Sequence, residues 1–268
     1  MKSDENKRVF FGLQIDAPWP ENLPAGELLA EKDRHATLAF LGDVHFPLLK
    51  SALARFPPPP FRVGFCGRFD KVLLLPPHHP RLVAWNMQFG EEIQKLIDYQ
   101  TLLSTWLKKE GLIFNKKHNF TPHVTMCRRP HALRDWKKKF SPLPFITTHL
   151  HLYESLGQLR YQPIWSYPLL PPFKEIDHTA DFGFEIFGES LLHLFSHAQI
   201  ALCFIFPPLI DFLITPSRLE THEDVIIALN ELVSHADIEL GIPFKAVSFH
   251  GNLKQKNTIY SWEMILDV

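Results

Sequence analysis

The sequence predicts two α+β domains that meet close to residue 170. Three observations support this class: apolar runs of strand length between proline-rich turns, an amphipathic helical pattern at residues 91–109, and a change of charge near Leu169–Pro172. The length of 268 residues exceeds the roughly 150 residues of an ordinary domain. Hydrophobic residues make up 46% and charged residues 21%, which predicts packed cores and excludes a disordered chain.

The first domain, residues 1–170, is expected to be rich in strands. The strands expected from apolar runs are residues 9–15, 35–41, 61–69, 72–75, 82–89, 123–127, 149–153 and 164–169. The runs 61–69 and 72–75 are expected to pair with each other. Helices are expected at residues 48–56, which precede four prolines, at residues 91–109, which end before Gly111, and briefly around Trp136.

The second domain, residues 171–268, is expected to contain helices and strands in similar amounts. Residues 173–186 are expected to form two strands or a strand and a turn, and further strands are expected at 245–250 and 260–268. The expected helices are 190–204 and 224–234, the latter with Thr221 as a candidate N-cap. The most apolar stretch, residues 200–214, is interrupted by Pro207 and Asp211 and is shorter than the roughly 20 residues that span a bilayer. We therefore expect it in a core, and expect no membrane association.

The net charge of −1 conceals an asymmetry between the two halves. Residues 1–171 hold 23 Lys and Arg against 15 Asp and Glu, a balance of +8, and residues 172–268 hold 5 against 14, a balance of −9. The basic half suits a polyanionic partner. Three widely spaced cysteines form neither a disulfide framework nor a zinc pattern, which is typical of a cytoplasmic protein.

A short motif, His-x-Thr followed by an apolar residue, occurs twice within strand-like runs, at His35 and Thr37 and again at His123 and Thr125. Residues i and i+2 of a strand project from the same face, so each motif places an imidazole beside a hydroxyl. Two histidines suit phosphodiester chemistry, because one can accept a proton from water while the other protonates the leaving oxygen. The hydroxyls can stabilise charge on the phosphoryl oxygens, and this chemistry needs no metal.

A single such motif in a chain with 15 histidines is weak, but the flanking residues strengthen it. The segments HATLAFLG, from His35, and FTPHVTMCR, around His123, resemble the two signatures of the 2H phosphoesterases, in particular the LigT-like RNA 2′,3′-cyclic phosphodiesterases. The resemblance covers most of residues 8–169. It implies a bilobal fold with antiparallel sheets around a cleft, and hydrolysis of terminal RNA 2′,3′-cyclic phosphates to a phosphomonoester, usually the 2′-phosphate.

The same resemblance assigns roles to individual residues. His35 and His123 carry the acid and base roles, with the first histidine usually taken as the acid, and Thr37 and Thr125 bind phosphate. Arg128 follows the second motif and is expected to contact the phosphate. Phe120 either stacks on a base or packs in the core. A run of Lys and Arg supports an RNA substrate, although part of such a run is usually a solvated face; it consists of Lys116, Lys117, Arg128, Arg129, Arg134, Lys137, Lys138 and Lys139.

The opening of the second domain, FKEIDHTADFGFEIFGESLLHL, resembles archease, the protein that activates the GTP-dependent RNA ligase of tRNA splicing and RNA repair. The segments KAVSFH, from Lys245, and MILDV, at the end of the chain, match in order. The resemblance implies a divalent cation, Ca²⁺ or Mg²⁺, held by Asp181 and Asp267, with Lys245 as a functional residue nearby. The segment between Val233 and Lys245 is shorter than in archease, so the resemblance implies a shortened domain.

These observations give two hypotheses of different class. The first is an enzyme that opens 2′,3′-cyclic phosphates at RNA ends, such as those of tRNA fragments, without a metal, coupled to a module for an RNA ligase. The second is a non-catalytic adaptor that binds RNA ends and presents them to the ligase. The paired histidines favour the enzyme, because a binding protein has no use for a proton donor and acceptor.

Overall fold

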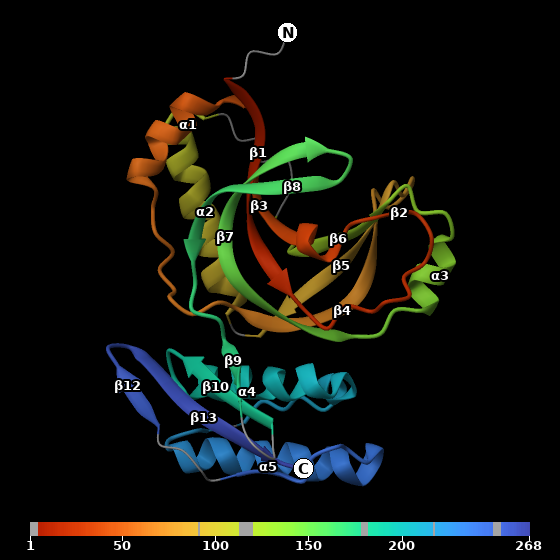
Figure 1. The fold of residues 1–268 in the computed structure, drawn as a ribbon, viewed down its shortest axis with the longest axis vertical. Helices are drawn as coiled ribbons and strands as arrows, with labels where there is room; N and C mark the ends of the chain where they lie inside the picture. Colours follow the sequence, from red (N-terminus) through yellow and green to blue (C-terminus); the bar gives the residue numbers. More distant parts are fainter. Residues whose placement is uncertain (1–4, 91, 113–119, 178–181, 217, 249–252) are drawn as a thin grey trace.

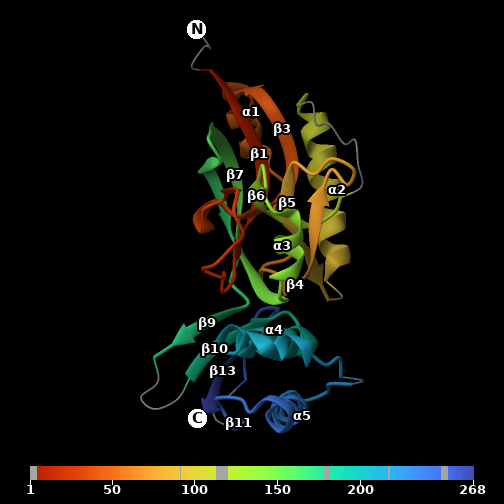
Figure 2. The same ribbon diagram turned by 90° about the vertical axis from the view of Figure 1, so that its right-hand side faces the viewer.

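The protein folds into two units, each built on its own antiparallel sheet (Figures 1 and 2). The structure is a computed structural model that describes residues 5–90, 92–112, 120–177, 182–216, 218–248 and 253–268. The sheet of the first unit ends at Pro168, and the sheet of the second begins at Phe173. The predicted α+β class with antiparallel sheets is confirmed.

The first unit contains eight strands in a single sheet. They are β1 (Asn6–Asp16), β2 (Glu27–Leu28), β3 (His35–His45), β4 (Cys66–Leu75), β5 (Leu82–Phe89), β6 (His123–Arg128), β7 (Leu143–Gly157) and β8 (Arg160–Pro168). The order along the sheet is β1-β3-β6-β5-β4-β7-β8, and β1 also pairs with β7. That additional pairing closes the sheet on itself. β3 meets β6 at one residue pair, Ala36 with Val124, so the sheet has a narrow seam between its two halves at this point.

Three helices surround this sheet, and their apolar residues explain their positions. They are α1 (Phe46–Ala52), α2 (Ile93–Lys109) and α3 (Leu133–Lys138). The buried face of α2 includes Leu96, Leu103 and Leu107, which recur at helical spacing and join the core of the first unit. Trp136 buries α3 against the same core.

The second unit packs two helices on one side of a five-stranded sheet (Figure 2). Its elements are β9 (Phe173–Ile176), β10 (Phe182–Gly188), α4 (Leu191–Ile205), α5 (His222–Leu240), β11 (Ala246–Val247), β12 (Lys254–Lys256) and β13 (Ile259–Asp267). The predicted N-cap is confirmed: Thr221 and Asp224 form a reciprocal capping box at the start of α5. The helix ends at Gly241, whose φ of 64° lies in the left-handed region that glycine adopts without strain.

Three of the expected strands, 61–69, 72–75 and 245–250, differ from the structure. Residues 66–75 form one strand, β4, which pairs with β5, so the expected pairing of 61–69 with 72–75 is wrong. The polar pair Asp70 and Lys71 marks a register shift within the strand rather than a turn, and the Asp70 carboxylate accepts a hydrogen bond from Asn86 Nδ2 at 2.7 Å. The expected strand 245–250 is reduced to β11 within the described residues.

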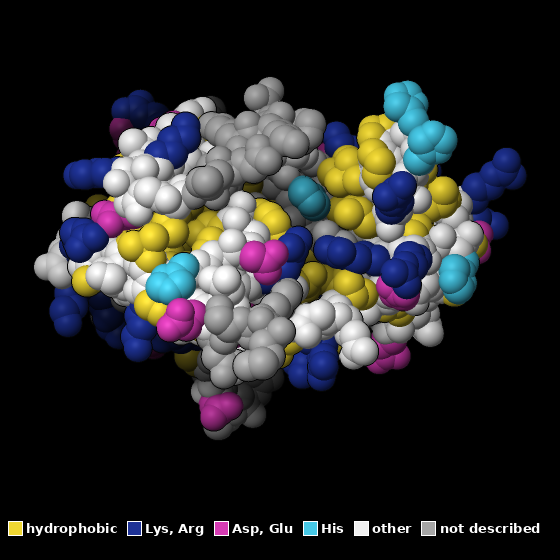
Figure 3. All heavy atoms as spheres, turned by 90° about the horizontal axis from the view of Figure 1, so that it is seen from above, with side chains coloured by type: hydrophobic (Ala, Val, Ile, Leu, Met, Phe, Trp, Pro, Cys, Tyr) yellow, Lys and Arg dark blue, Asp and Glu magenta, His cyan; other side chains and the backbone are white. Residues whose placement is uncertain are grey.

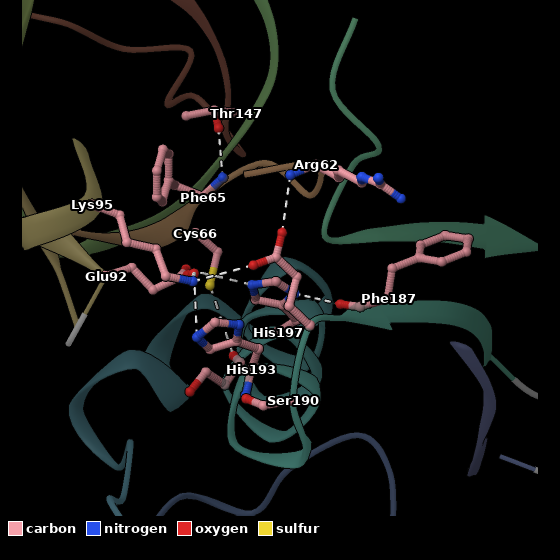
Figure 4. Close-up of polar contacts among 12 residues, drawn as sticks. Arg62, Phe65, Cys66, Glu92, Lys95, Thr147, Phe187, Ser190, His193 and His197 are labelled. Carbon is pink, nitrogen blue, oxygen red and sulfur yellow. Dashed lines mark hydrogen bonds and ion pairs between the residues drawn. The ribbon is translucent and has the colours of Figure 1, made fainter. Parts of the chain in front are cut away.

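The two units share a buried interface. Cys66 of β4 and Ile146 of β7 belong to the hydrophobic core of the second unit. Beside them lies a set of titratable side chains that we name the interface cluster: Glu92 and Lys95 from the first unit, and Glu189, His193 and His197 from the second (Figure 4). The Glu92 carboxylate faces both imidazoles, at 3.5 Å from His193 Nε2 and 3.7 Å from His197 Nε2. The units are therefore joined by apolar packing and by buried charge.

Among the described residues, no helix combines the length and the apolar character needed to cross a membrane. The apolar stretch 200–214, expected in a core, forms the end of α4 and the short helical turn at Pro207–Asp211. Its residues Ala201, Leu202 and Leu209 are fully buried in the core of the second unit.

Candidate active site

The two His-x-Thr motifs lie side by side on neighbouring antiparallel strands. Ala36 of β3 pairs with Val124 of β6, and both are buried, at 1% and 0% exposure. Because successive side chains of a strand alternate between faces, the residues that flank this pair all project to the opposite face. The structure therefore brings together His35, Thr37, His123 and Thr125, as the sequence predicts.

Both histidines are oriented by the same local device. His35 Nδ1 lies 2.7 Å from the carbonyl oxygen of Asp33, and His123 Nδ1 lies 2.7 Å from the carbonyl oxygen of Thr121. A carbonyl oxygen only accepts, so Nδ1 donates in each case. In the neutral ring this leaves the Nε2 lone pair free to accept a proton. Each imidazole thus carries one nitrogen for positioning and one for chemistry.

His35 sits in an aromatic enclosure. Its ring lies 4.6 Å from the ring of Phe10, 5.2 Å from that of Tyr153 and 4.8 Å from that of Tyr161, measured between centroids. Burial, together with the nearby charges of His123 and Arg128, lowers the pKa of His35 to about 4 against the opposing effect of Asp33. In the free protein His35 is therefore neutral at pH 7 and suited to accept a proton, whereas the resemblance gives the first histidine the acid role.

A cavity of about 1180 Å³ opens in front of these strands. It is lined by Arg8, Phe10, Glu27, Leu28, His35, Thr37, Phe40, Pro80, Arg81, Leu82, Thr125, Arg128, Arg129, Pro130, Ser155, Gly157, Gln158, Leu159 and Tyr161. His123 is half-buried and is not among them, yet its charge reaches His35. The cavity is larger than the roughly 300–1,000 Å³ of most small-molecule pockets, so it can hold an extended ligand.

The lining of the cavity is basic and partly aromatic. Arg8 is paired with Asp43 at 3.3 Å and Arg129 with Glu27 at 2.7 Å. Arg81 and Arg128 have no carboxylate partner within the part of the chain that the structure describes, so their charge is available to an anion. Seen from the end of the molecule opposite the second unit, Lys and Arg side chains cross the middle of the surface with hydrophobic side chains exposed between them (Figure 3).

Two expectations for substrate-binding residues have different outcomes. Arg128, which is expected to contact the phosphate, lines the cavity. Phe120 is half-buried and packs against the core of the first unit, and it is not among the lining residues of the cavity. Of the predicted basic run, Arg128 and Arg129 line the cavity, the residues from Arg134 onward lie on or after α3 and outside the lining, and Lys116 and Lys117 fall outside the described residues.

Several site residues carry no sequence signal of their own. Arg8 and Phe10 come from β1, Arg81 precedes β5 and Tyr161 comes from β8, and each reaches the site through strand pairing over a long sequence distance. Phe10 lies in an apolar strand, so the sequence alone would place it in the hydrophobic core rather than at a cavity.

In the second unit, two of the three residues expected from the archease resemblance come together. The Lys245 amide donates to the Asp267 carbonyl oxygen at 2.7 Å, and both side chains are exposed. Asp181 lies outside the described residues, so the predicted pairing of Asp181 with Asp267 lies outside them as well. No three His, Cys, Asp or Glu side chains of the described segments are placed to hold a metal ion together. The Asp267 carboxylate is a hard oxygen ligand of the kind that Ca²⁺ or Mg²⁺ takes.

Comparisons with known proteins give similarity to solved structures only. No family model matches the sequence, and no curated protein matches it. LigT of E. coli in complex with 3′-AMP is 24% identical with a TM-score of 0.45, and a phosphoesterase is 23% identical with a TM-score of 0.46; each covers 62% of this chain and 99% of its own. A protein of Thermus thermophilus, TT0787, is 17% identical over 60% of this chain and 97% of its own, with a TM-score of 0.42. The similarity to LigT and to the phosphoesterase thus extends over about three fifths of this chain.

Proposed function

We propose that this protein hydrolyses the terminal 2′,3′-cyclic phosphate of RNA to a 2′-phosphate without a metal. One observation carries the proposal: His35 and His123, with Thr37 and Thr125, share one face of adjacent strands, and each imidazole is fixed through Nδ1 with Nε2 left for chemistry. Arg81 and Arg128, which pair with no carboxylate among the described residues, supply positive charge for an anion at the same cavity.

The proposed reaction gives the two histidines complementary roles. Neutral His35 takes a proton from water, whose oxygen attacks phosphorus and forms the new P–O bond. The bond from phosphorus to the 3′ oxygen breaks, and protonated His123 gives its proton to that oxygen. The hydroxyls of Thr37 and Thr125 donate to the phosphoryl oxygens, and Arg128 balances their growing negative charge. His35 thus acts as the base and His123 as the acid.

An RNA end, rather than a small metabolite, fits the shape and lining of the cavity. Its volume of about 1180 Å³ leaves room for more than one nucleotide around a phosphate. The exposed ring of Phe40 lies under the Arg8 guanidinium at 4.9 Å, which offers a flat surface on which a base can stack. Such stacking tolerates any base, so we expect broad sequence specificity.

The proposal is tested with an oligoribonucleotide that ends in a 2′,3′-cyclic phosphate, in buffer with EDTA. We expect turnover that EDTA leaves unchanged, with a 2′-phosphate found by end-group analysis. Because the base must be neutral in the free enzyme and the pKa of His35 is lowered to about 4, kcat/KM is expected to decline on the acid side only near pH 4.

The matched control is the same oligonucleotide with a linear 3′-phosphate, which should remain unchanged. Binding of the cyclic oligonucleotide with no turnover would instead support the adaptor hypothesis. Loss of turnover in EDTA would contradict the two-histidine reaction, and an acid limb near pH 6.5 would contradict the role of His35 as base.

For the second unit we propose, from the archease resemblance, that it stimulates a GTP-dependent RNA ligase with the help of a divalent cation. The support is that Lys245 and Asp267 lie side by side and exposed on an acidic unit, which suits a basic protein partner rather than RNA. A covalent link would then keep the phosphodiesterase at high effective concentration near the ligase.

The measurement is the guanylylation rate of a cognate ligase with and without the full chain. Asp267→Ala and Asp181→Ala are expected to remove the stimulation, whereas Glu231→Gln, an exposed change on α5, should keep it. No change in rate with the intact chain, together with no co-purification of the ligase, would show that the second unit lacks this role.

A further inference from the structure

Asp33 lies two residues before His35, at the end of a short 3-10 helix, and is buried, at 4% exposure, although an aspartate is normally solvated. The backbone carbonyl oxygen and the side-chain carboxylate of Asp33 accept hydrogen bonds from different residues. The carbonyl oxygen accepts from His35 Nδ1 at 2.7 Å, and the carboxylate oxygen Oδ1 accepts from the backbone amide of Tyr161 at 2.8 Å. One residue therefore connects the histidine to a strand 128 positions away in the sequence.

The strand that Asp33 holds carries a hairpin that lines the cavity. β7 and β8 are joined through Gln158 and Leu159, and both have positive φ, at 52° and 60°. These values define a tight turn of the type that matches strand twist, but side chains other than glycine and asparagine adopt them at a cost. Contacts elsewhere must offset that cost, and the Asp33–Tyr161 bond lies two residues from the turn.

The consequence reaches the imidazole directly. The Tyr161 ring meets the His35 ring edge to face, at 4.8 Å and 81°, and also meets Phe10 at 5.3 Å. The amide that Asp33 holds belongs to the same residue as this ring. Displacement of the hairpin would therefore move the wall of the cavity and the surroundings of His35 together.

We propose that Asp33 is the positioning residue of this site: its carbonyl group orients His35, and its carboxylate holds the β7–β8 hairpin against the imidazole. The expected loss of kcat rests on the proposed function, whereas the structural role of Asp33 does not. Thr121, whose carbonyl orients His123, is exposed, so the two motifs share the carbonyl contact while the buried carboxylate belongs to the first.

The test compares Asp33→Ala with Asp33→Asn in the full chain. The alanine lacks the acceptor for the Tyr161 amide, and a displacement of about 1 Å at a catalytic group can cost about 100-fold, so we expect kcat to fall by roughly 10-fold to 100-fold with a smaller change in KM. The asparagine keeps an oxygen acceptor and should restore most of kcat. Asp135→Ala, an exposed change on α3, is the control and should leave kcat unchanged.

A second readout does not depend on activity. In NMR spectra at pH 7, the His35 ring protons should carry a ring-current shift from Tyr161 and nitrogen shifts of the Nδ1–H tautomer. Asp33→Ala should lose the ring-current shift and Asp33→Asn should keep it. The charged groups that affect the pKa of His35 are His123, Arg128 and Asp33. If Asp33→Ala does not fold, Tyr161→Ala is used in its place, because it removes the ring that causes the shift and should abolish the ring-current shift of His35.

An unchanged His35 spectrum in Asp33→Ala would overturn the proposal, as would equal loss of kcat in Asp33→Ala and Asp33→Asn. If the unaltered protein does not hydrolyse the cyclic phosphate, the proposed function fails while the spectra still decide the role of Asp33. The two failures are therefore distinguishable.

Discussion

Alanine at either His35 or His123 is expected to lower the turnover of a 2′,3′-cyclic phosphate by about 100-fold to 10,000-fold, the range that one acid or base contributes. The fall in turnover is expected to be larger for His35→Ala, because the neutral Nε2 of His35 is available in most molecules at pH 7. The two losses should not add, because both groups act in the same step. The measurement is kcat and KM of the single and double variants on the same oligonucleotide.

RNA affinity should change little in both single variants, because Arg81 and Arg128 remain at the cavity. His45→Ala is the matched control: this histidine ends β3, its side chain is exposed, and it lies outside the cavity lining. Turnover that survives in both single variants would exclude the two-histidine reaction. A parallel loss in His45→Ala would point to general destabilisation instead.

Removal of the Glu92 carboxylate is expected to lower the free energy of unfolding by roughly 3–5 kcal/mol, because it leaves a buried charge without its partner. Burial alone would raise the pKa of Glu92, but His197, His193 and Lys95 outweigh it and lower the pKa. Burial alone would lower the pKa of His197, yet Cys66 and Glu92 raise it to about 10, so the His197 imidazolium is charged at pH 7. In Glu92→Gln this charge stays buried, with His197 at 1% exposure.

The contribution of His197 to the free energy of unfolding depends on pH. The pKa of His197 is higher in the folded chain than its ordinary value of 6.5, so its stabilisation is complete below pH 6.5 and is lost as the pH rises towards 10. Urea unfolding of the full chain at pH 6 and pH 9 should therefore show a smaller pH difference in Glu92→Gln than in the unaltered protein. Glu263→Gln breaks an exposed pair with Lys254 and should change little. Equal stability of Glu92→Gln and Glu263→Gln would show that the interface cluster is not a significant source of stability.

Much of the fold could be predicted because local pattern and local structure agree. The predicted strand 82–89 matches β5, and the expected helix 91–109 matches α2 within two residues, because the apolar spacing of each is strong. The error at residues 61–75 has a clear cause. A polar Asp-Lys pair within an apolar run is typical of a turn, but here it occupies an irregularity inside a single strand.

The candidate site was predictable to the extent that it is local. The i, i+2 rule places an imidazole and a hydroxyl on one face, and strand pairing then joins the two motifs. Asp33 and Tyr161 could not be found in this way, because their importance arises from a hydrogen bond between residues 128 positions apart. Phe120 illustrates the reverse, since a position beside a motif does not by itself place a side chain in the cavity.

The pairing that closes the first sheet has a consequence for the synthesis of the chain. Val9 of β1 pairs with Glu154 of β7, so β1 lacks one of its two neighbours until more than half of the protein has left the ribosome. During that interval the apolar residues of β1 have β3 as their partner on one side only. His35 likewise acquires the rings of Tyr153 and Tyr161 late. Long-range closure of this kind is slow to form, so a nascent chain carries both motifs well before it carries a working site.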